Sequence, residues 1–159
     1  MTTITPSLWF DTQAEEAAQF YCSVFPDSRI LDVSRYGDDA GERAGTVLTV
    51  TFEIAGAPFM GLNGGPMYRF SEAISFSVPA DTQDEIDRLW DTLTSEGGEP
   101  GQCGWLKDRF GVSWQVVPSQ LGDLIGGGSD PEASGRAMAA MLQMTKLDIA
   151  ALQAARDGI

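Results

Sequence analysis

The sequence contains no histidine and only two cysteines, and these absences exclude several kinds of chemistry. Without histidine there is no Ser–His or Cys–His pair for nucleophilic catalysis, and the commonest ligand of transition metals is missing. The two cysteines, Cys22 and Cys103, are too few for a disulfide framework, so we expect both to be free thiols.

Basic residues are also scarce, because ten Lys and Arg face 23 Asp and Glu, for a formal net charge of −13. Nucleic-acid binding needs a basic surface, and anionic membranes repel acidic chains, so we expect neither partner. No apolar run approaches the ~20 residues that cross a bilayer. Residues 1–6 lack the basic and apolar regions of a secretory signal, and we therefore expect a soluble cytoplasmic protein.

What the sequence does contain is a duplication. The five residues from Asp11 to Glu15 (DTQAE) return 70 residues later, from Asp81 to Glu85 (DTQDE). Each copy follows an alternating apolar run and opens a helical pattern. Thr-x-x-Glu is typical of a capping box, in which the threonine hydroxyl accepts from the third helical amide and the glutamate reaches back. We therefore interpret the chain as two copies of one unit.

The periodicity within each copy predicts a strand, a helix and three further strands. In the first copy the strands are expected at 3–10, 29–36, 46–54 and 58–63, and the helix at 13–25. In the second copy the strands are expected at 73–78, 99–103, 105–109 and 113–118, and the helix at 83–95. After residue 118 the pattern predicts helices at 131–144 and 149–155.

The predicted fold class is α+β. Two repeated βαβββ modules, 3–63 and 73–118, form a curved mixed sheet with the helices outside. A C-terminal helical extension spans 130–157, and residues 1–159 form a single domain.

Alternation along the strands predicts which side chains face away from the helices. One face of the strands is apolar and large, and should carry the helices, whereas the other is small or polar. A curved sheet would present this second face as a cup for a ligand, and the alternative is a plain solvent-facing surface. The residues placed on the cup floor are Phe59, Asn63, Ser75, Ser77, Ser113 and Gln115, with Trp105 and Asp108 at the rim.

Several segments carry a family resemblance: LWFD at Leu8–Asp11, LNGGP at Leu62–Pro66, GWLKDRFG at Gly104–Gly111 and SWQVVP at Ser113–Pro118. They resemble the PhnB-like branch of the vicinal oxygen chelate superfamily, which includes glyoxalase I and bleomycin-resistance proteins. This branch is often labelled as 3-demethylubiquinone 3-methyltransferase-like. The resemblance covers nearly the whole chain and implies a glyoxalase-like domain that forms a homodimer.

The superfamily's enzymes bind a divalent metal through four side chains, usually His and Glu, on the first and last strands of each unit. The resemblance places Pro6, Gly61, Ala73 and Gln115 close to these positions. Three of them cannot coordinate a metal through a side chain, and a neutral amide is a poor ligand. We therefore expect no metal and no other cofactor. A carboxylate-only site, for example from Glu53 with Asp108, is the alternative.

Three functions remain open. The first is a metal-free, small-molecule-binding module built as a dimeric cup. The second is an enzyme of the same fold, a lyase, isomerase or transferase, in which Glu53, Asp108 or Gln115 serves as acid, base or orienting group. No catalytic residue is assigned, and no glycine loop joins a strand to a helix as a cofactor-binding loop would. The third is a protein-interaction module that uses the methionines of 131–144, whose alternative role is core packing.

Overall fold

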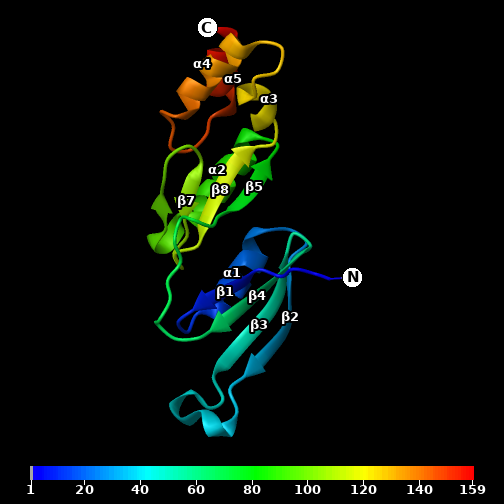
Figure 1. Cartoon of the computed structure of the whole chain (residues 1–159), viewed down its shortest axis with the longest axis vertical. Coiled ribbons are helices and arrows are strands. Elements are labelled where there is room, and N and C mark those ends of the chain that lie inside the picture. Colours follow the sequence, from blue (N-terminus) through cyan, green and yellow to red (C-terminus); the bar gives the residue numbers. More distant parts are fainter. Residues whose placement is uncertain (1) are drawn as a thin grey trace. The chain divides into compact units, whose positions relative to one another are not determined.

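In the computed structural model, which describes residues 2–159, the chain forms two compact units, Met1–Phe70 and Ser71–Ile159. Each unit contains one strand–helix–three-strand module (Figure 1). The strands pair in the same order in both units, and this confirms the predicted α+β fold with two βαβββ modules.

Module one contains a mixed four-stranded sheet with one helix. Its elements are β1 (Ser7–Phe10), α1 (Ala14–Val24), β2 (Arg29–Arg35), the 3-10 turn η1 (Asp38–Arg43), β3 (Val47–Ile54) and β4 (Ala57–Asn63). The strand order is β1-β4-β3-β2, with β1 parallel to β4 and the other pairs antiparallel. Ala55 (φ 48°) and Gly56 (φ 77°) form the two-residue turn between β3 and β4. Positive φ at both positions is what a tight hairpin of right-twisted strands requires.

The core of module one lies between α1 and one face of its sheet. The predicted helical stripe is buried as a whole: Ala14, Ala17, Ala18, Tyr21 and Val24. The ring of Tyr21 stacks on Phe52 of β3, with ring centroids 6.4 Å apart. Burial of these apolar side chains supplies the main stabilisation of the module.

Module two repeats this arrangement with shorter strands. Its elements are β5 (Phe76–Ala80), α2 (Gln83–Leu93), the 3-10 turn η2 (Ser95–Gly97), β6 (Glu99–Pro100), β7 (Trp105–Lys107) and β8 (Ser113–Pro118). The order is β5-β8-β7-β6. The predicted stripe of α2 is buried: Ile86, Leu89, Trp90 and Leu93. Several predicted boundaries were wrong: β1 begins at residue 7 and not 3, and β5 begins at 76 and not 73. The ends of α2, β6, β7 and the later helix α4 (Pro131–Met141) lie at 93, 100, 107 and 141, two or three residues before the predicted ones.

The register shows that the two modules are equivalent residue by residue. Phe10 of β1 pairs with Asn63 at the end of β4, and Ala80 of β5 pairs with Pro118 at the end of β8. The next residue bonds back to the first strand in both modules, where the Gly64 N–H donates to the Phe10 carbonyl (3.0 Å) and the Ser119 N–H to the Ala80 carbonyl (2.9 Å). The Asn63 position therefore corresponds to the Pro118 position.

The two helices start by different means. In α2 the Thr82 hydroxyl accepts from the Glu85 N–H (3.2 Å), as predicted for a capping box. The Glu85 carboxylate reaches back one residue further than predicted, because it accepts from the Asp81 N–H (3.1 Å) and not from the N–H of the cap residue Thr82. In α1 no side chain of the local segment caps the helix, and the prediction of a Thr12/Glu15 box was wrong. Asn63 provides the acceptor instead, since its Oδ1 accepts from the Ala14 N–H (2.9 Å). Proline at the equivalent position 118 has no such acceptor.

The C-terminal extension adds α3 (Leu121–Ile125), α4 (Pro131–Met141) and α5 (Ile149–Asp157) to module two (Figure 1). The short helix α3 was not predicted. Leu124, Leu147 and Leu152 form the buried cluster of the extension, and Met141 and Met144 pack against it. In the described part of the chain, no helix has the length and apolar character that crossing a membrane requires.

Candidate functional site

Strand register decides which side chains share the face away from the helices, here called the open face. In module two, Ser77, Gln115 and Trp105 are register partners across β5, β8 and β7. They alternate with Trp114, which is 2% exposed beneath α2. The Gln115 Nε2 donates to the Ser75 hydroxyl (2.8 Å). Four of the predicted floor and rim residues are therefore neighbours on one sheet face.

The next row of the same face contains a buried hydroxyl, from Ser113, and a charged lysine, Lys107, that is paired with two carboxylates. Ser113 is 2% exposed, and among residues 2–159 its hydroxyl has no hydrogen-bond partner. Its register partner Lys107 lies between the carboxylates of Glu99 (3.0 Å) and Glu72 (3.1 Å). Hydrogen bonds to Glu99 and Glu72 raise the pKa of Lys107, and a backbone hydrogen bond and Lys107 lower the pKa of Glu72. The ammonium charge is thus already balanced by the protein.

The prediction that Phe59 and Asn63 face away from the helix is wrong. Phe59 is 8% exposed and stacks on Phe52, and Asn63 is 7% exposed and bonded to the start of α1. Gly61 lies between them on β4, and a Cβ there would lie 3.1 Å from the Cβ of Ala14. The small residue of β4 therefore makes room for the helix, and the larger Met60 and Leu62 occupy the open face.

Asp108 is not an exposed group at the rim of a cup. It is 3% exposed, and its Oδ1 accepts from the Phe110 N–H (2.9 Å) and the Val112 N–H (3.1 Å). Its Oδ2 accepts from the Trp114 indole N–H (2.9 Å). Both oxygens hold the turn between β7 and β8, so the carboxylate is structural. Glu53, the other candidate acid, forms an ion pair with Arg29 (2.9 Å).

The residues at the superfamily's metal positions do not fit a divalent cation. Gly61 faces α1, and Pro6 and Ala73 precede their strands. On the open faces, the first and last strands pair instead through Ser7 with Met60 and through Ser77 with Gln115. Such a set lacks the His and carboxylate ligands that a divalent site needs. Within residues 2–159, no three His, Cys, Asp or Glu side chains are grouped to hold a metal.

Sequence reasoning missed an aromatic pair on the open face of module one. Trp9 of β1 is the register partner of Leu62, and its indole N–H donates to the Gly65 carbonyl (2.8 Å). The ring of Tyr68, which is 61% exposed, meets Trp9 edge-on with centroids 5.0 Å apart. A Cβ on Gly64 would lie 2.2 Å from the indole, so the Gly-Gly segment is shaped around Trp9. The sequence could have predicted this placement, because Trp9 lies between the buried residues Leu8 and Phe10 and must therefore point to the opposite face of the strand.

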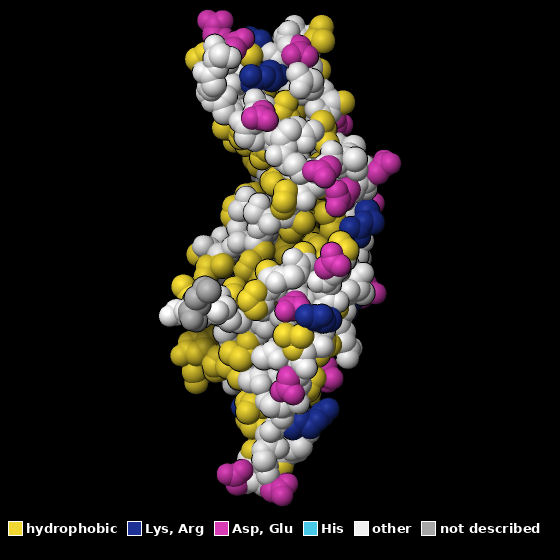
Figure 2. Space-filling model, turned by 90° about the vertical axis from the view of Figure 1, so that its right-hand side faces the viewer, with side chains coloured by type: hydrophobic (Ala, Val, Ile, Leu, Met, Phe, Trp, Pro, Cys, Tyr) yellow, Lys and Arg dark blue, Asp and Glu magenta, His cyan; other side chains and the backbone are white. Residues whose placement is uncertain are grey.

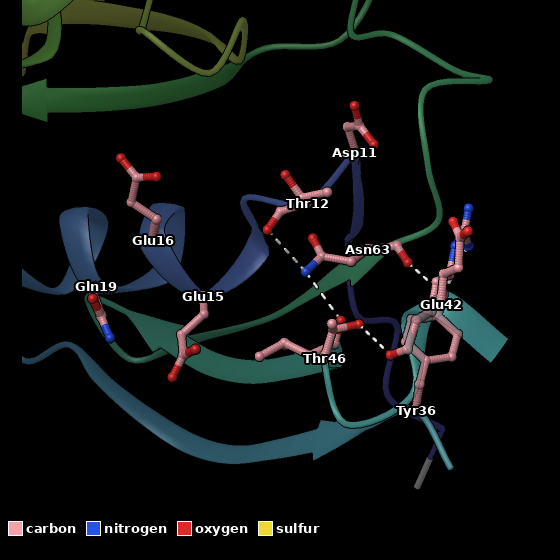
Figure 3. A pocket seen from close by; sticks show the side chains of 11 residues that line it. Asp11, Thr12, Glu15, Glu16, Gln19, Tyr36, Glu42, Thr46 and Asn63 are labelled. Carbon is pink, nitrogen blue, oxygen red and sulfur yellow. Dashed lines mark hydrogen bonds between the residues drawn. The ribbon is translucent and has the colours of Figure 1, made fainter. Parts of the chain in front are cut away.

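Module one also contains a cavity of about 590 Å³ between the start of α1 and the β2–β3 loop (Figure 3). Asn63 lies at its centre, and its Nδ2 donates to the carbonyls of Thr12 and Val47 (3.2 Å each). The Tyr36 hydroxyl donates to the main-chain carbonyl of Asn63 (2.6 Å). Arg43 Nη1 donates in turn to the hydroxyl oxygen of Tyr36 (3.3 Å). These bonds tie the loop to the helix start.

The chemistry of this cavity is mainly acidic. Its lining includes the carboxylates of Asp11, Glu15, Glu16 and Glu42, with Arg43 as the one basic side chain there. Acidic side chains in the first turn of a helix are stabilised by the positive end of the helix dipole. The position of Glu15 and Glu16 in the first turn of α1 accounts for their presence here without a ligand. Both polar atoms of the Asn63 side chain already have partners within the protein, at the start of α1 and in β3. Acidic side chains are also spread over the face seen in Figure 2, with apolar side chains between them.

Comparison with known families agrees with this geometry. A family model described as 3-demethylubiquinone-9 3-methyltransferase matches residues 2–117, which cover both modules. The chain belongs to this family. No curated protein sequence matches the chain.

One solved structure supports membership of the 3-demethylubiquinone-9 3-methyltransferase family, and a second shows the same fold. A putative member from Bacillus cereus, described as a PhnB protein, is 34% identical, with a TM-score of 0.66 over 73% of this chain and 99% of that chain. A protein from Pseudomonas aeruginosa is 24% identical, with a TM-score of 0.59 over 74% of this chain and 98% of that one.

A more distant structure shows the fold alone. The fosfomycin resistance protein FosX from Listeria monocytogenes, complexed with Mn(II) and sulfate, is 14% identical, with a TM-score of 0.52 over 77% of this chain and 93% of that chain. This chain therefore shares the fold of that fosfomycin resistance protein. The match to residues 2–117 leaves the C-terminal extension outside the family model.

Proposed function

We propose that this family member binds a neutral, planar small molecule on the open face of module two, with Gln115 as the main polar contact. The observation that carries the proposal is the row of Ser77, Gln115 and Trp105 across three strands. One amide N–H of Gln115 is held by Ser75. A primary amide has a second N–H and a carbonyl, so Gln115 can both donate to and accept from a ligand. Trp105 offers an aromatic surface for stacking.

The charge around this row favours a neutral ligand. The side chains of Ser75, Ser77 and Gln115 carry no charge, and Lys107 is balanced by Glu72 and Glu99. The formal net charge of −13 disfavours anions over the whole chain. A conjugated ring bearing a carbonyl or amide meets these conditions. The family name points to a quinone, which is one compound of this class, and the proposal concerns binding and not methyl transfer.

Benzamide and benzoate test this assignment, because they share a ring and differ in charge. We expect the protein to bind benzamide, and to bind benzoate at least about tenfold more weakly. The Gln115→Ala variant should lower the affinity for benzamide about fivefold, since a lost buried hydrogen bond costs about 1 kcal/mol. Isothermal calorimetry or NMR titration measures both.

The matched control for this test is Gln19→Ala, which removes an exposed glutamine of α1. It should leave the affinity for benzamide unchanged. Equal binding of benzamide by the native protein and Gln115→Ala, or no binding of benzamide at all, would overturn the proposed function.

We also propose that the protein is a homodimer. The strands β1 and β2 lie at the edges of one sheet and β5 and β6 at the edges of the other. Edge strands present unpaired main-chain groups that proteins tend to cover. Leu142, just after α4, is 56% exposed and adds apolar surface. Light scattering at micromolar concentration should therefore give twice the chain mass of 17.1 kDa, and a monomer mass would contradict the proposal.

A further inference from the structure

The C-terminal extension is bound to module two along the segment that joins α4 to α5. The N–H groups of Cys103 and Gly104 donate to the carbonyls of Met144 and Thr145 (2.8 Å each), so the segment pairs with the chain just before β7. The extension is therefore attached by main-chain hydrogen bonds to the turn before β7, in which Cys103 (φ 57°) and Gly104 (φ 83°) both have positive φ.

A glutamine from the start of α2 clamps the same segment. Gln83 Nε2 donates to the Leu147 carbonyl (3.1 Å), and Gln83 Oε1 accepts from the Ile149 N–H (2.9 Å). Lys146 forms an ion pair with Asp87 of α2 (2.7 Å). The Gln83 amide thus donates one hydrogen bond to this segment and accepts another from it. The two bonds together fix the position of the segment on module two.

Close packing completes the attachment. Leu147 is fully buried, and a Cβ on Gly104 would lie 3.1 Å from its Cδ1. Gly104 has φ +83°, a conformation that favours glycine. Glycine at this position therefore allows Leu147 to approach the sheet closely. The extension is a fixed part of module two and not a loose tail.

Val117 connects this packing to the proposed binding face. It follows Gln115 by two positions in β8 and so lies on the same face of the sheet, with Pro79 as its register partner. Val117 packs against the cluster of Leu124, Leu147 and Leu152. Figure 1 shows α3, α4 and α5 gathered beyond the carboxyl end of β8. The open face that passes through Gln115 therefore ends at the extension.

We infer that the C-terminal extension forms an end wall of the module-two binding face and limits the length of the ligand that this face accepts. The inference rests on the proposed function and adds a determinant of specificity to it. The extension lies outside the family match of residues 2–117, and the Bacillus cereus structure is matched over 99% of its length by 73% of this chain. The end wall therefore lies outside the part of the chain that the family model covers.

A series of benzamides with 3- or 4-alkyl chains from methyl to butyl tests the end wall in the full-length protein. We expect affinity to fall at least about tenfold beyond a certain chain length. Val117→Ala should extend that length by one or more carbons, and Val117→Leu should shorten it. Unsubstituted benzamide, which has no alkyl chain, is the reference ligand against which the length limit of each variant is measured.

The matched control is Val33→Ala, which truncates a half-buried valine of β2 in module one and should leave the length limit unchanged. Melting temperatures confirm that each variant is folded, and the two opposite substitutions at position 117 keep the test decisive if one of them unfolds. Binding of benzamide through Gln115 without a length limit, or with a limit that neither variant moves, would overturn the end wall alone. Failure of the native protein to bind benzamide would overturn the proposed function and the end wall together.

Discussion

At the residue scale, Asn63 shows how a distant side chain can replace a local helix cap. Its amide joins three segments, because it accepts from Ala14 at the start of α1 and donates to the carbonyls of Thr12 and Val47. The residue is 7% exposed, and without its side chain the buried N–H of Ala14 would lose its acceptor. Buried polar groups that lose a partner cost more than the bond itself contributes.

We expect Asn63→Ala to lower the free energy of unfolding by about 2–4 kcal/mol, since it removes a buried helix cap and two further hydrogen bonds, to the carbonyls of Thr12 and Val47. Thr82→Ala is the matched control in module two and should cost about 1 kcal/mol, the usual effect of losing a helix cap. Urea unfolding measures both values. If Asn63→Ala costs no more than Thr82→Ala, the amide does not hold the three segments together.

At the scale of secondary-structure elements, the extension depends on the cluster around Leu147. This side chain is fully buried between the extension and module two. Leu147→Ala should lower the free energy of unfolding by about 2–5 kcal/mol, because it removes apolar contacts and leaves a cavity. Leu142→Ala, at a position 56% exposed, should change it by no more than about 0.5 kcal/mol. Similar losses in chemical unfolding for both variants would contradict the assigned core of the extension.

The ion pair between α2 and the extension predicts a dependence on pH. Its hydrogen bond to Lys146 holds the pKa of Asp87 below its ordinary value. The stability from this pair is therefore present above the ordinary aspartate pKa of about 3.9 and is lost as pH falls through the lower folded value. The effect is small, because both side chains are more than a third exposed.

Melting temperatures recorded from about pH 6 down to about pH 2.5 measure this dependence across the range in which aspartate titrates. The fall in melting temperature at the acid end should be smaller in Asp87→Asn than in the native protein. Asp123→Asn, at an exposed position of α3, is the control and should follow the native curve. If the melting temperatures of Asp87→Asn and of the native protein fall equally at acid pH, the ion pair does not stabilise the extension.

At the scale of the whole molecule, the open faces formed by residues 2–159 lack a ligand set for a divalent ion. The positions where first and last strands pair are held by Ser7 with Met60 and by Ser77 with Gln115. We expect the purified protein to carry no stoichiometric divalent metal, and chelator to leave its melting temperature unchanged, because these side chains bind such ions weakly. Elemental analysis measures the first and thermal unfolding the second. One equivalent of tightly bound zinc or nickel would refute this expectation.

The sequence alone determined the modular architecture of this protein. Alternating apolar residues predicted the strands, and the spacing of the buried residues of α1 and α2 predicted both helical stripes. The repeated Thr-x-x-Glu predicted the cap of α2, and strand alternation placed Ser77 and Gln115 on the open face. Each of these features is a local periodicity or a contact within a few residues, so neighbouring sequence contains the information that it requires.

Only the tertiary structure decided the facing of β4, the cap of α1 and the role of Asp108. The alternation in β4 was visible, but its helix-packing side became clear only from the approach of Ala14 to Gly61. Asn63 lies 49 positions from the amide that it caps, and the carboxylate of Asp108 bonds the indole of Trp114 on the next strand. These contacts depend on which segments fold against each other, and the pattern of a single segment does not contain that information.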